Sequence, residues 1–192
     1  MIMEVYQSID ELLEKKETVV IALEGGSASG KTTLAMELQQ RYGCSVFHMD
    51  DFFLRPEQRT KERLAQVGGN VDRERFYEEV VLPLNKGETI EYRRFDCSTF
   101  TLLPAVKIEV NKLVIIEGAY STHPALGKYY DLSVFLEVEP ELQKERILKR
   151  NGREKAERFF QEWIPMEQNY FEAFGVKERC DLVISIGVRR NL

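Results

Sequence analysis

The chain has few of the features that mark secreted or membrane-bound proteins. Its 192 residues include only three cysteines, Cys44, Cys97 and Cys180, an odd and scattered set without CxxC spacing. This pattern argues against a disulfide framework and favours free thiols in a reducing compartment. No apolar run approaches the roughly 20 residues that cross a bilayer, and residues 1–10 lack the basic and apolar regions of a signal peptide. We therefore expect a cytoplasmic location and no membrane association.

Positive charge is also scarce. The chain has 27 Lys and Arg against 32 Asp and Glu, a net charge of −5, and no cluster of five or more basic residues. Nucleic-acid binding through phosphate neutralisation is therefore disfavoured, and a small-molecule partner is expected. His48 and His123 lack ligand-like spacing, and Trp163 beside Phe159 and Phe160 favours core packing. The oligomeric state stays open, with a homo-oligomer as one possible form.

The segment Gly25 to Thr32 reads GxxxxGK[ST], the pattern of a phosphate-binding loop. It follows the apolar run 18–23 and precedes the helix-like run 33–38, which is the strand–loop–helix context that this loop requires. Backbone N–H groups, a helix N-terminus, a lysine and a threonine hydroxyl there bind phosphates and Mg²⁺. The sequence predicts that a nucleoside triphosphate is held by Gly25, Gly26, Ser27, Ala28, Ser29, Gly30, Lys31, Thr32 and Thr33.

Apolar runs alternate with helix-like segments along the chain. The expected strands are 18–24, 45–49, 113–116, 132–138 and 182–186, and two short ones at 89–95 and 105–110. The expected helices are 4–16, one from the loop to about 42, one from 72 with an irregularity or end at Pro83, 140–150 and 154–173. Residues 52–71 are expected to be irregular. This alternation predicts an α/β fold, a three-layer parallel sheet with helices on both faces.

Acidic side chains follow predicted strands at the sheet edge where ligands bind. Asp50 and Asp51 end the second strand, and Glu117 follows the apolar run 113–116. In phosphoryl transfer to an alcohol, a carboxylate orients the hydroxyl and accepts its proton, which we assign to Asp50. Asp50, Glu117 and Thr32 are the predicted Mg²⁺ ligands. The alternatives are turn caps at the aspartates and an ordinary strand-end acid at Glu117.

Three arginines recur around a predicted helix end. Arg146, Arg150 and Arg153 flank the break at Gly152, which predicts a lid over about 146–157. Such arginines neutralise charge that grows on a transferred phosphoryl group, and a closed lid excludes water. The alternative is a solvated helix face, which explains many charge runs.

The segment Tyr92 to Asp96 is a candidate for acceptor binding within the short strands at about 88–110. The ring of Tyr92 could stack on a base, and Arg93 could hold a hydroxyl or carbonyl group. The alternative is an edge strand with an exposed basic pair. The length of the chain fits a single domain over residues 1–192 that contains these strands and the lid.

Together these motifs resemble the uridine kinase and phosphoribulokinase group of P-loop kinases over about residues 17–187. The resemblance rests on the ordered set GGSASGKTT, HMDDFF at 48–53, Asn70-Val71-Asp72, Tyr92 to Asp96, Glu117-Gly118 and the lid arginines. It implies a P-loop NTPase architecture of the nucleoside- and nucleotide-kinase kind, with ATP and Mg²⁺ as cofactors. It further implies transfer of the γ-phosphoryl group to a hydroxyl, with the 5′-hydroxyl of a nucleoside such as uridine or cytidine as the first choice.

The resemblance and the motifs together assign roles to residues of this chain. The predicted catalytic residues are Asp50, Lys31, Arg150 and Arg153, and the predicted substrate-binding residues are Asp50, Phe53, Asp72, Tyr92, Arg93, Glu117 and Arg146. The chain departs from the family at Phe53, which lacks the family's tyrosine hydroxyl, and in a shorter lid. It also has Asp72-Arg73-Glu74 where uridine kinases have Asp-His-Pro. Because Asp-Asp-Phe-Phe also resembles nicotinamide riboside kinases, that nucleoside or another metabolite stays an alternative acceptor.

Two other classes of function compete with a kinase. A GTP-dependent switch would read guanine through Asn-Lys-x-Asp, whereas Asn85-Lys86-Gly87-Glu88 ends in glutamate and follows a helix. A nucleotide-binding module without turnover is the other alternative. The retention of Lys31, Asp50 and Glu117 argues against such a loss of activity.

Overall fold

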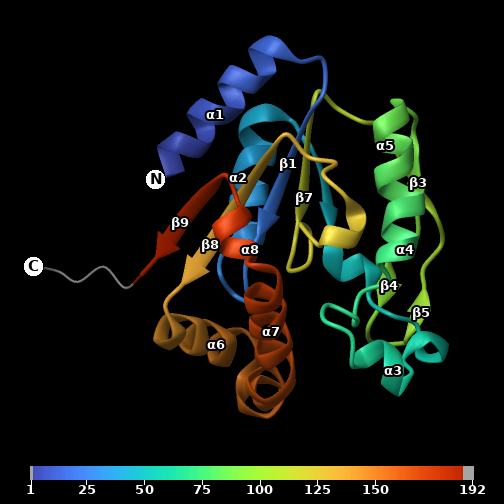
Figure 1. The fold of residues 1–192 in the computed structure, drawn as a ribbon, viewed down its shortest axis with the longest axis vertical. Coiled ribbons are helices and arrows are strands. Elements are labelled where there is room, and N and C mark those ends of the chain that lie inside the picture. The colour runs from blue at the N-terminus through green and yellow to red at the C-terminus, as the bar shows by residue number, and fades with distance from the viewer. Residues whose placement is uncertain (1, 188–192) are drawn as a thin grey trace, which may run out of the picture.

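The computed structural model describes residues 2–187, with a five-stranded sheet at its centre in the order β2-β7-β1-β8-β9. Every neighbouring pair in this sheet is parallel, and helices cover both faces (Figure 1). The strands are β1 (Val19–Glu24), β2 (Ser45–His48), β7 (Leu113–Glu117), β8 (Leu132–Val138) and β9 (Leu182–Ile186). The predicted three-layer α/β fold is therefore confirmed, and each of these strands ends within one residue of its predicted bounds.

The central strands form because their apolar runs supply two cores at once. Successive side chains of a strand point to opposite faces. In β1, Ile21 and Leu23 pack in one core, whereas Val20 packs in the other. Strand β7 alternates in the same way, and all five of its residues are buried. A strand buried on both faces needs a continuous apolar run rather than an alternating one. Because such runs stand out in a sequence, the central strands could be predicted.

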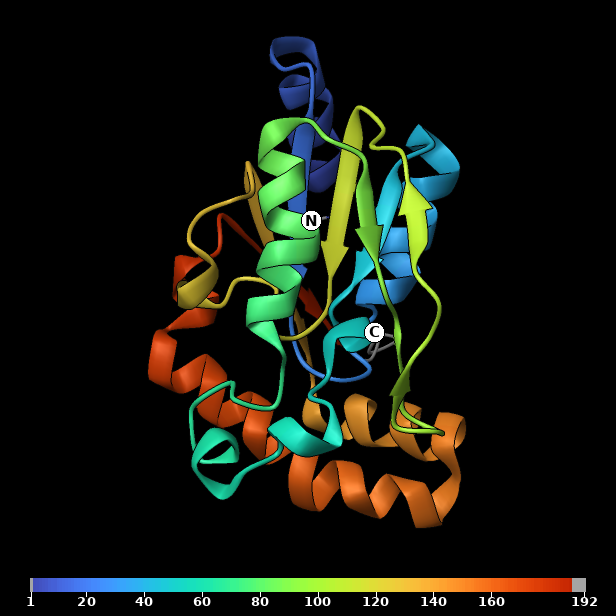
Figure 2. The ribbon, with the colours of Figure 1, turned by 90° about the vertical axis from the view of Figure 1, so that its right-hand side faces the viewer.

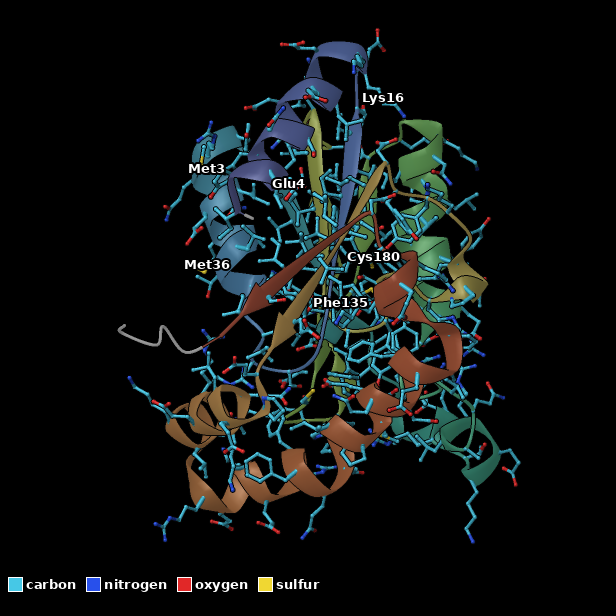
Figure 3. The ribbon with its side chains drawn as sticks, turned by 60° about the vertical axis from the view of Figure 1, so that its left-hand side comes forward. Met3, Glu4, Lys16, Met36, Phe135 and Cys180 are labelled. Atoms are coloured by element: carbon cyan, nitrogen blue, oxygen red, sulfur yellow. The ribbon has the colours of Figure 1, made fainter. Side chains whose placement is uncertain are left out.

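One face of the sheet is covered by α1 (Ile2–Lys15) and α2 (Lys31–Tyr42). Val5 and Ile9 of α1 and Leu34 of α2 are buried in the same core. The two helices lie on the same side of the molecule, with Met3 and Met36 on its outer surface (Figure 3). Helical spacing of apolar residues predicted both helices, and their burial against the sheet supplies the stabilisation that short helices lack alone.

The opposite face carries a helical segment and a hairpin, which stand side by side in Figure 2. The segment comprises α4 (Arg73–Phe76), the π-helical turn η3 (Tyr77–Val81) and α5 (Leu82–Lys86), and the antiparallel hairpin comprises β3 (Ile90–Tyr92) and β6 (Val106–Ile108). Asp72 caps the segment by accepting the Arg75 backbone N–H, at 3.2 Å. The irregularity expected at Pro83 is present as η3, and the helical path continues beyond it.

The carboxyl ends of the strands point toward a second group of elements, at the bottom of Figure 1. These are α6 (Pro140–Arg158), the π-helical turn η5 (Phe159–Trp163), α7 (Ile164–Phe174) and the small hairpin of β4 (Phe95–Asp96) and β5 (Thr101–Leu102). Gly152 interrupts α6 with φ 73° and ψ 167°, which is the predicted break. The lid region therefore lies at the sheet edge where ligands of this architecture bind.

The structure corrects two local expectations. Strand β2 ends at His48, so Asp50 and Asp51 lie in the 3₁₀ turn η1 (Met49–Phe52) that follows it. The segment expected to be irregular contains η2 (Pro56–Gln58) and α3 (Lys61–Leu64), because Thr60 caps α3 through the Arg63 N–H. Among residues 2–187, no helix has both the length and the apolar content that a membrane span requires.

Candidate active site

The phosphate loop joins β1 to α2 and leaves several N–H groups available. Gly25 has φ 137°, and a Cβ there would lie 2.4 Å from the Leu136 carbonyl oxygen, so only glycine fits. Gly30 adopts the left-handed conformation as the N-cap of α2. The N–H groups of Lys31 and Thr32 have no acceptor among the described residues. Free N–H groups at a helix N-terminus form an anion site, as the motif predicted.

Lys31 is positioned by the loop itself. Its ammonium group donates to the Gly26 carbonyl at 2.8 Å and lies 3.5 Å from the Ser29 hydroxyl. The side chain is only 8% exposed, so the charge is directed along the loop rather than into bulk water. A buried ammonium beside open N–H groups favours binding of a polyphosphate.

A hydroxyl and a carboxylate meet beside the loop. Thr32 Oγ1 donates to Glu117 Oε1 at 3.2 Å, and His48 Nδ1 lies 2.5 Å from the same oxygen. The hydrogen bond to Glu117 is the main cause that raises the pKa of His48. Gly118 has φ 140°, and a Cβ there would lie 2.6 Å from the Met49 Cβ, so the chain passes close to η1 as expected.

These oxygens fit Mg²⁺ better than a metal held by the protein alone. No group of three His, Cys, Asp or Glu suited to a metal occurs within residues 2–187. Mg²⁺ binds few protein oxygens and keeps phosphate and water ligands. Thr32 and Glu117, which converge beside the phosphate loop, match that requirement. The assignment of Asp50 as a third ligand stays a prediction.

Asp50 and Asp51 occupy different surroundings in η1. Asp50 opens onto the cleft, where desolvation is the main cause that raises its pKa; Glu117 adds to the rise and Lys31 opposes it. Asp51 instead accepts a hydrogen bond from the Tyr92 hydroxyl at 3.1 Å. Asp50 is therefore the carboxylate available to a ligand, and Asp51 has a structural partner.

One cleft of about 1060 Å³ runs from the phosphate loop to the lid. Its phosphate end is lined by Lys31, Thr32 and Glu117, and Asp50 lines the same cleft. The aromatic end is lined by Phe53, Phe95, Phe100, Tyr120, Phe159 and Trp163. Phe53 and Trp163 approach each other at 5.9 Å between ring centroids, although they are far apart in the sequence. The cleft therefore combines groups suited to phosphate, aromatic walls suited to a flat ring, and the carboxylate of Asp50.

The predicted site residues divide into those that reach this cleft and those that do not. Arg146 and Arg150 line it, and Arg146 donates to the Ala28 carbonyl at 3.0 Å. Arg153 and Arg93 do not line it. Asp72 is 2% exposed and accepts a hydrogen bond from Gln58 at 2.8 Å, and Tyr92 is 4% exposed beside Phe52. The ligand roles of these four residues remain predictions without support from their positions.

Two buried carboxylates beside the loop were missed in the sequence. Glu24 accepts hydrogen bonds from the backbone N–H groups of Gly25, Tyr120 and Thr122, at 3.0 to 3.1 Å, and from the Tyr170 hydroxyl at 3.0 Å. Glu167 accepts two from Ser27 of the loop. Desolvation raises the pKa of both carboxyl groups. No local pattern marks them, because their partners come from distant segments.

Two residues that line the cleft, Trp163 and Arg59, and His48 beside Glu117 had no assigned role. Trp163 was expected in the core, but it lies at the cleft wall on η5. His48, expected to be unremarkable, contacts Glu117. Arg59 lines the cleft and its guanidinium has no hydrogen-bond or ion-pair partner among the described residues, whereas Arg63 and Arg75 nearby bind carboxylates. A free cation in a ligand cleft is a recognition candidate that only the tertiary structure shows.

A phosphate loop between a strand and a helix of a parallel sheet, with a carboxylate in the adjoining cleft, is typical of the class of P-loop kinases. A comparison with known proteins identifies the family within this class. The family described as "Phosphoribulokinase / Uridine kinase family" matches residues 20–170, so the chain belongs to that family. The enzyme is accordingly a phosphotransferase that acts on an alcohol hydroxyl, as predicted.

Curated relatives share about a quarter of their aligned residues with this chain. The uridine kinase of Chloroflexus aurantiacus is 26% identical over 143 residues, which cover 69% of this chain and 68% of the relative. The uridine kinase of Ligilactobacillus salivarius is 26% identical over 152 residues, covering 75% and 70%. Uridine kinase-like protein 4 of Arabidopsis thaliana is 28% identical over 154 residues, which cover 73% of this chain but only 32% of that longer relative.

Solved structures support the fold. A candidate fructose transport system kinase from Silicibacter sp. TM1040 superposes with a TM-score of 0.72 at 22% identity, covering 96% of this chain and 98% of that one. D-glycerate 3-kinase from Cryptococcus neoformans superposes with a TM-score of 0.66 at 14% identity, covering 100% and 97%. At such identities the likeness extends to the architecture and not to the acceptor.

Proposed function

We propose that this enzyme transfers the γ-phosphoryl group of ATP to the 5′-hydroxyl of a nucleoside, with uridine and cytidine as the first candidates. The observation that carries the proposal is the set of aromatic side chains that line the same cleft as Asp50 and the phosphate loop. Its rings suit a flat heterocycle, because aromatic stacking on a base contributes about 1–3 kcal/mol. A ribose placed between base and loop would direct its 5′-hydroxyl toward Asp50.

Each step of the transfer has a residue suited to it. Asp50 would orient the hydroxyl and accept its proton as the new oxygen–phosphorus bond forms and the bond to the β-phosphate oxygen breaks. Lys31 and the loop N–H groups would hold the phosphates in line with that hydroxyl. Arg146 and Arg150 would neutralise charge on the transferred group. Thr32 and Glu117 would hold Mg²⁺, which supplies charge neutralisation on the β and γ phosphates.

The test measures ADP release with Mg²⁺ and ATP across uridine, cytidine, nicotinamide riboside, pantothenate and a sugar phosphate, with products identified by mass. The expected result is rapid turnover of one nucleoside and a product heavier by one phosphoryl group. The matched control is 5′-deoxyuridine, which keeps the base and the ribose diol but lacks the hydroxyl and should give only background. Turnover confined to pantothenate or the sugar phosphate would contradict the proposal.

A second acceptor is supported by the same aromatic walls. A pyridinium ring is both flat and cationic, and aromatic faces attract cations at about 0.5–2 kcal/mol each. Nicotinamide riboside therefore belongs in the panel as the alternative. A nucleotide-binding protein without turnover is the remaining alternative, and it predicts ATP binding without ADP release for every compound.

A further inference from the structure

The outer turn of the phosphate loop is held by side chains of α6 and α7. Glu167 of α7 accepts hydrogen bonds from the Ser27 backbone N–H at 2.8 Å and from its hydroxyl at 2.6 Å. Gln143 of α6 donates to the Ser27 carbonyl at 2.8 Å. The backbone N–H, the backbone carbonyl and the hydroxyl of Ser27 are thus all bound to the helices that enter and leave the lid.

The contact between Glu167 and the phosphate loop is close, and it requires the burial of a carboxylate. Glu167 is 7% exposed, and a Cβ on Gly26 would lie 3.1 Å from the Gln143 amide nitrogen and 3.4 Å from a Glu167 oxygen. Burying a carboxylate beside an anion-binding loop is unfavourable unless strong hydrogen bonds compensate. The two bonds from Ser27 are the compensation that the structure shows, and together they fix the loop to α7.

The N–H groups of the loop divide into bound and open ones. Those of Gly25 and Ser27 donate to Glu24 and Glu167, whereas those of Lys31 and Thr32 have no acceptor among residues 2–187. Glu167 therefore occupies a donor at the outer turn and leaves the donors at the helix N-terminus available. An arrangement of this kind fixes the loop in one conformation before phosphate arrives, which lowers the entropy cost of binding.

We propose that Glu167 is a positioning residue for phosphoryl transfer that couples the lid to the phosphate loop through Ser27. When the lid helices and the loop share this contact, the loop cannot change its outer turn unless α7 follows. The inference concerns the nucleotide and does not depend on which acceptor the enzyme uses.

The chain supplies its own probe for the test. Its only tryptophan, Trp163, lies on η5 four residues before Glu167 and lines the same cleft. Its fluorescence, excited near the red edge of tryptophan absorption, would be followed while Mg²⁺-ATP is added. The variants are Glu167→Ala, Glu167→Gln, Ser27→Ala and the double change Glu167→Ala with Ser27→Ala. Glu172→Gln, an exposed position on the same helix, is the matched control.

We expect Glu167→Ala to raise the dissociation constant of Mg²⁺-ATP about tenfold, which corresponds to about 1.4 kcal/mol. Glu167→Gln keeps an acceptor oxygen for Ser27 and should stay within about threefold of wild type, as should the control. Ser27→Ala should give an intermediate loss, and the double variant should bind little worse than Glu167→Ala, because both changes break one contact.

Steady-state kinetics separate positioning from a loss of folded protein. A smaller folded fraction lowers the apparent kcat and leaves KM unchanged, whereas the proposal expects KM for ATP to rise and KM for the acceptor to stay constant. The proposal would be overturned by wild-type ATP affinity in Glu167→Ala, by equal losses in Glu167→Ala and Glu167→Gln, or by additive losses in the double variant. If Glu167→Ala does not fold, wild-type affinity in Ser27→Ala overturns it.

Discussion

The phosphate end and the aromatic end of the cleft are built in different ways. The phosphate end comes mainly from the continuous segment 25–33, which supplies backbone N–H groups and Lys31, and Glu117 is its one contribution from a distant strand. The aromatic end gathers side chains from separate segments of the chain, namely Phe53, Phe95, Tyr120, Phe159 and Trp163. Under the proposed function, the phosphate end would bind a group common to all nucleoside triphosphates, and the aromatic end would discriminate among acceptors. Substitutions at the phosphate end should lower activity with every acceptor by the same factor, whereas substitutions at the aromatic end should lower it by factors that differ between acceptors.

The largest expected effect lies at Asp50, which lines the cleft together with residues of both ends. Asp50→Asn keeps the shape of the side chain but cannot accept the hydroxyl proton, so kcat should fall about 10³-fold. ATP affinity, measured by Trp163 fluorescence, should change less than about threefold, because Lys31 and the loop remain. A variant that keeps near wild-type turnover would show that another group is the base. Asp51→Asn is the control, since Asp51 is bound to Tyr92.

Next in size is the change Lys31→Ala at the phosphate end. Loss of an ammonium group directed along the loop should lower kcat/KM for ATP about 10²-fold. The factor should be the same for uridine, cytidine or any other accepted alcohol, because the lysine would contact the phosphates and not the acceptor. The measurement is the ratio of wild-type to variant kcat/KM for ATP, taken with two different acceptors. Ratios that differ more than threefold between the acceptors would contradict the separation of the two ends.

A smaller and selective effect is expected at the aromatic end. Phe53→Ala removes a ring that lies 5.9 Å from Trp163, and it should raise KM for the acceptor about tenfold. KM for ATP should stay within twofold of wild type. Phe53→Tyr, which restores the hydroxyl found in the family, should keep the acceptor KM near its wild-type value. Equal rises in both KM values would indicate a general disturbance of the cleft and not a loss of base stacking.

The smallest effect is expected at Arg93, which the sequence suggested as a substrate ligand. Its side chain is exposed and does not line the cleft, whereas Arg59 lines it and has no hydrogen-bond or ion-pair partner within residues 2–187. Arg93→Ala should therefore change the acceptor KM less than twofold, and Arg59→Ala should raise it about fivefold. Acceptor saturation curves of the two variants, recorded together, provide the measurement. A larger rise of the acceptor KM in Arg93→Ala than in Arg59→Ala would indicate that Arg93, and not Arg59, binds the acceptor.

The sequence predicted the phosphate end of the cleft better than the residues that bind the acceptor, and the reason is physical. The loop could be predicted because glycine geometry, the lysine and the helix start are fixed by neighbours in the chain. Asp50 and Glu117 could be placed at the same edge because parallel strands end there together. Asp72 and Tyr92 were assigned to the ligand from their motifs, yet both side chains are buried and bound to Gln58 and Asp51.

The amino-acid sequence by itself determined the layered sheet, the phosphate loop and the break at Gly152, since each depends on apolar runs or on local backbone conformation. The tertiary structure alone decided that Glu167 binds Ser27, that Trp163 lies beside Phe53, and that Arg59 lines the cleft. Contacts between segments so far apart depend on how whole helices pack against the sheet edge, and no local spacing encodes that packing.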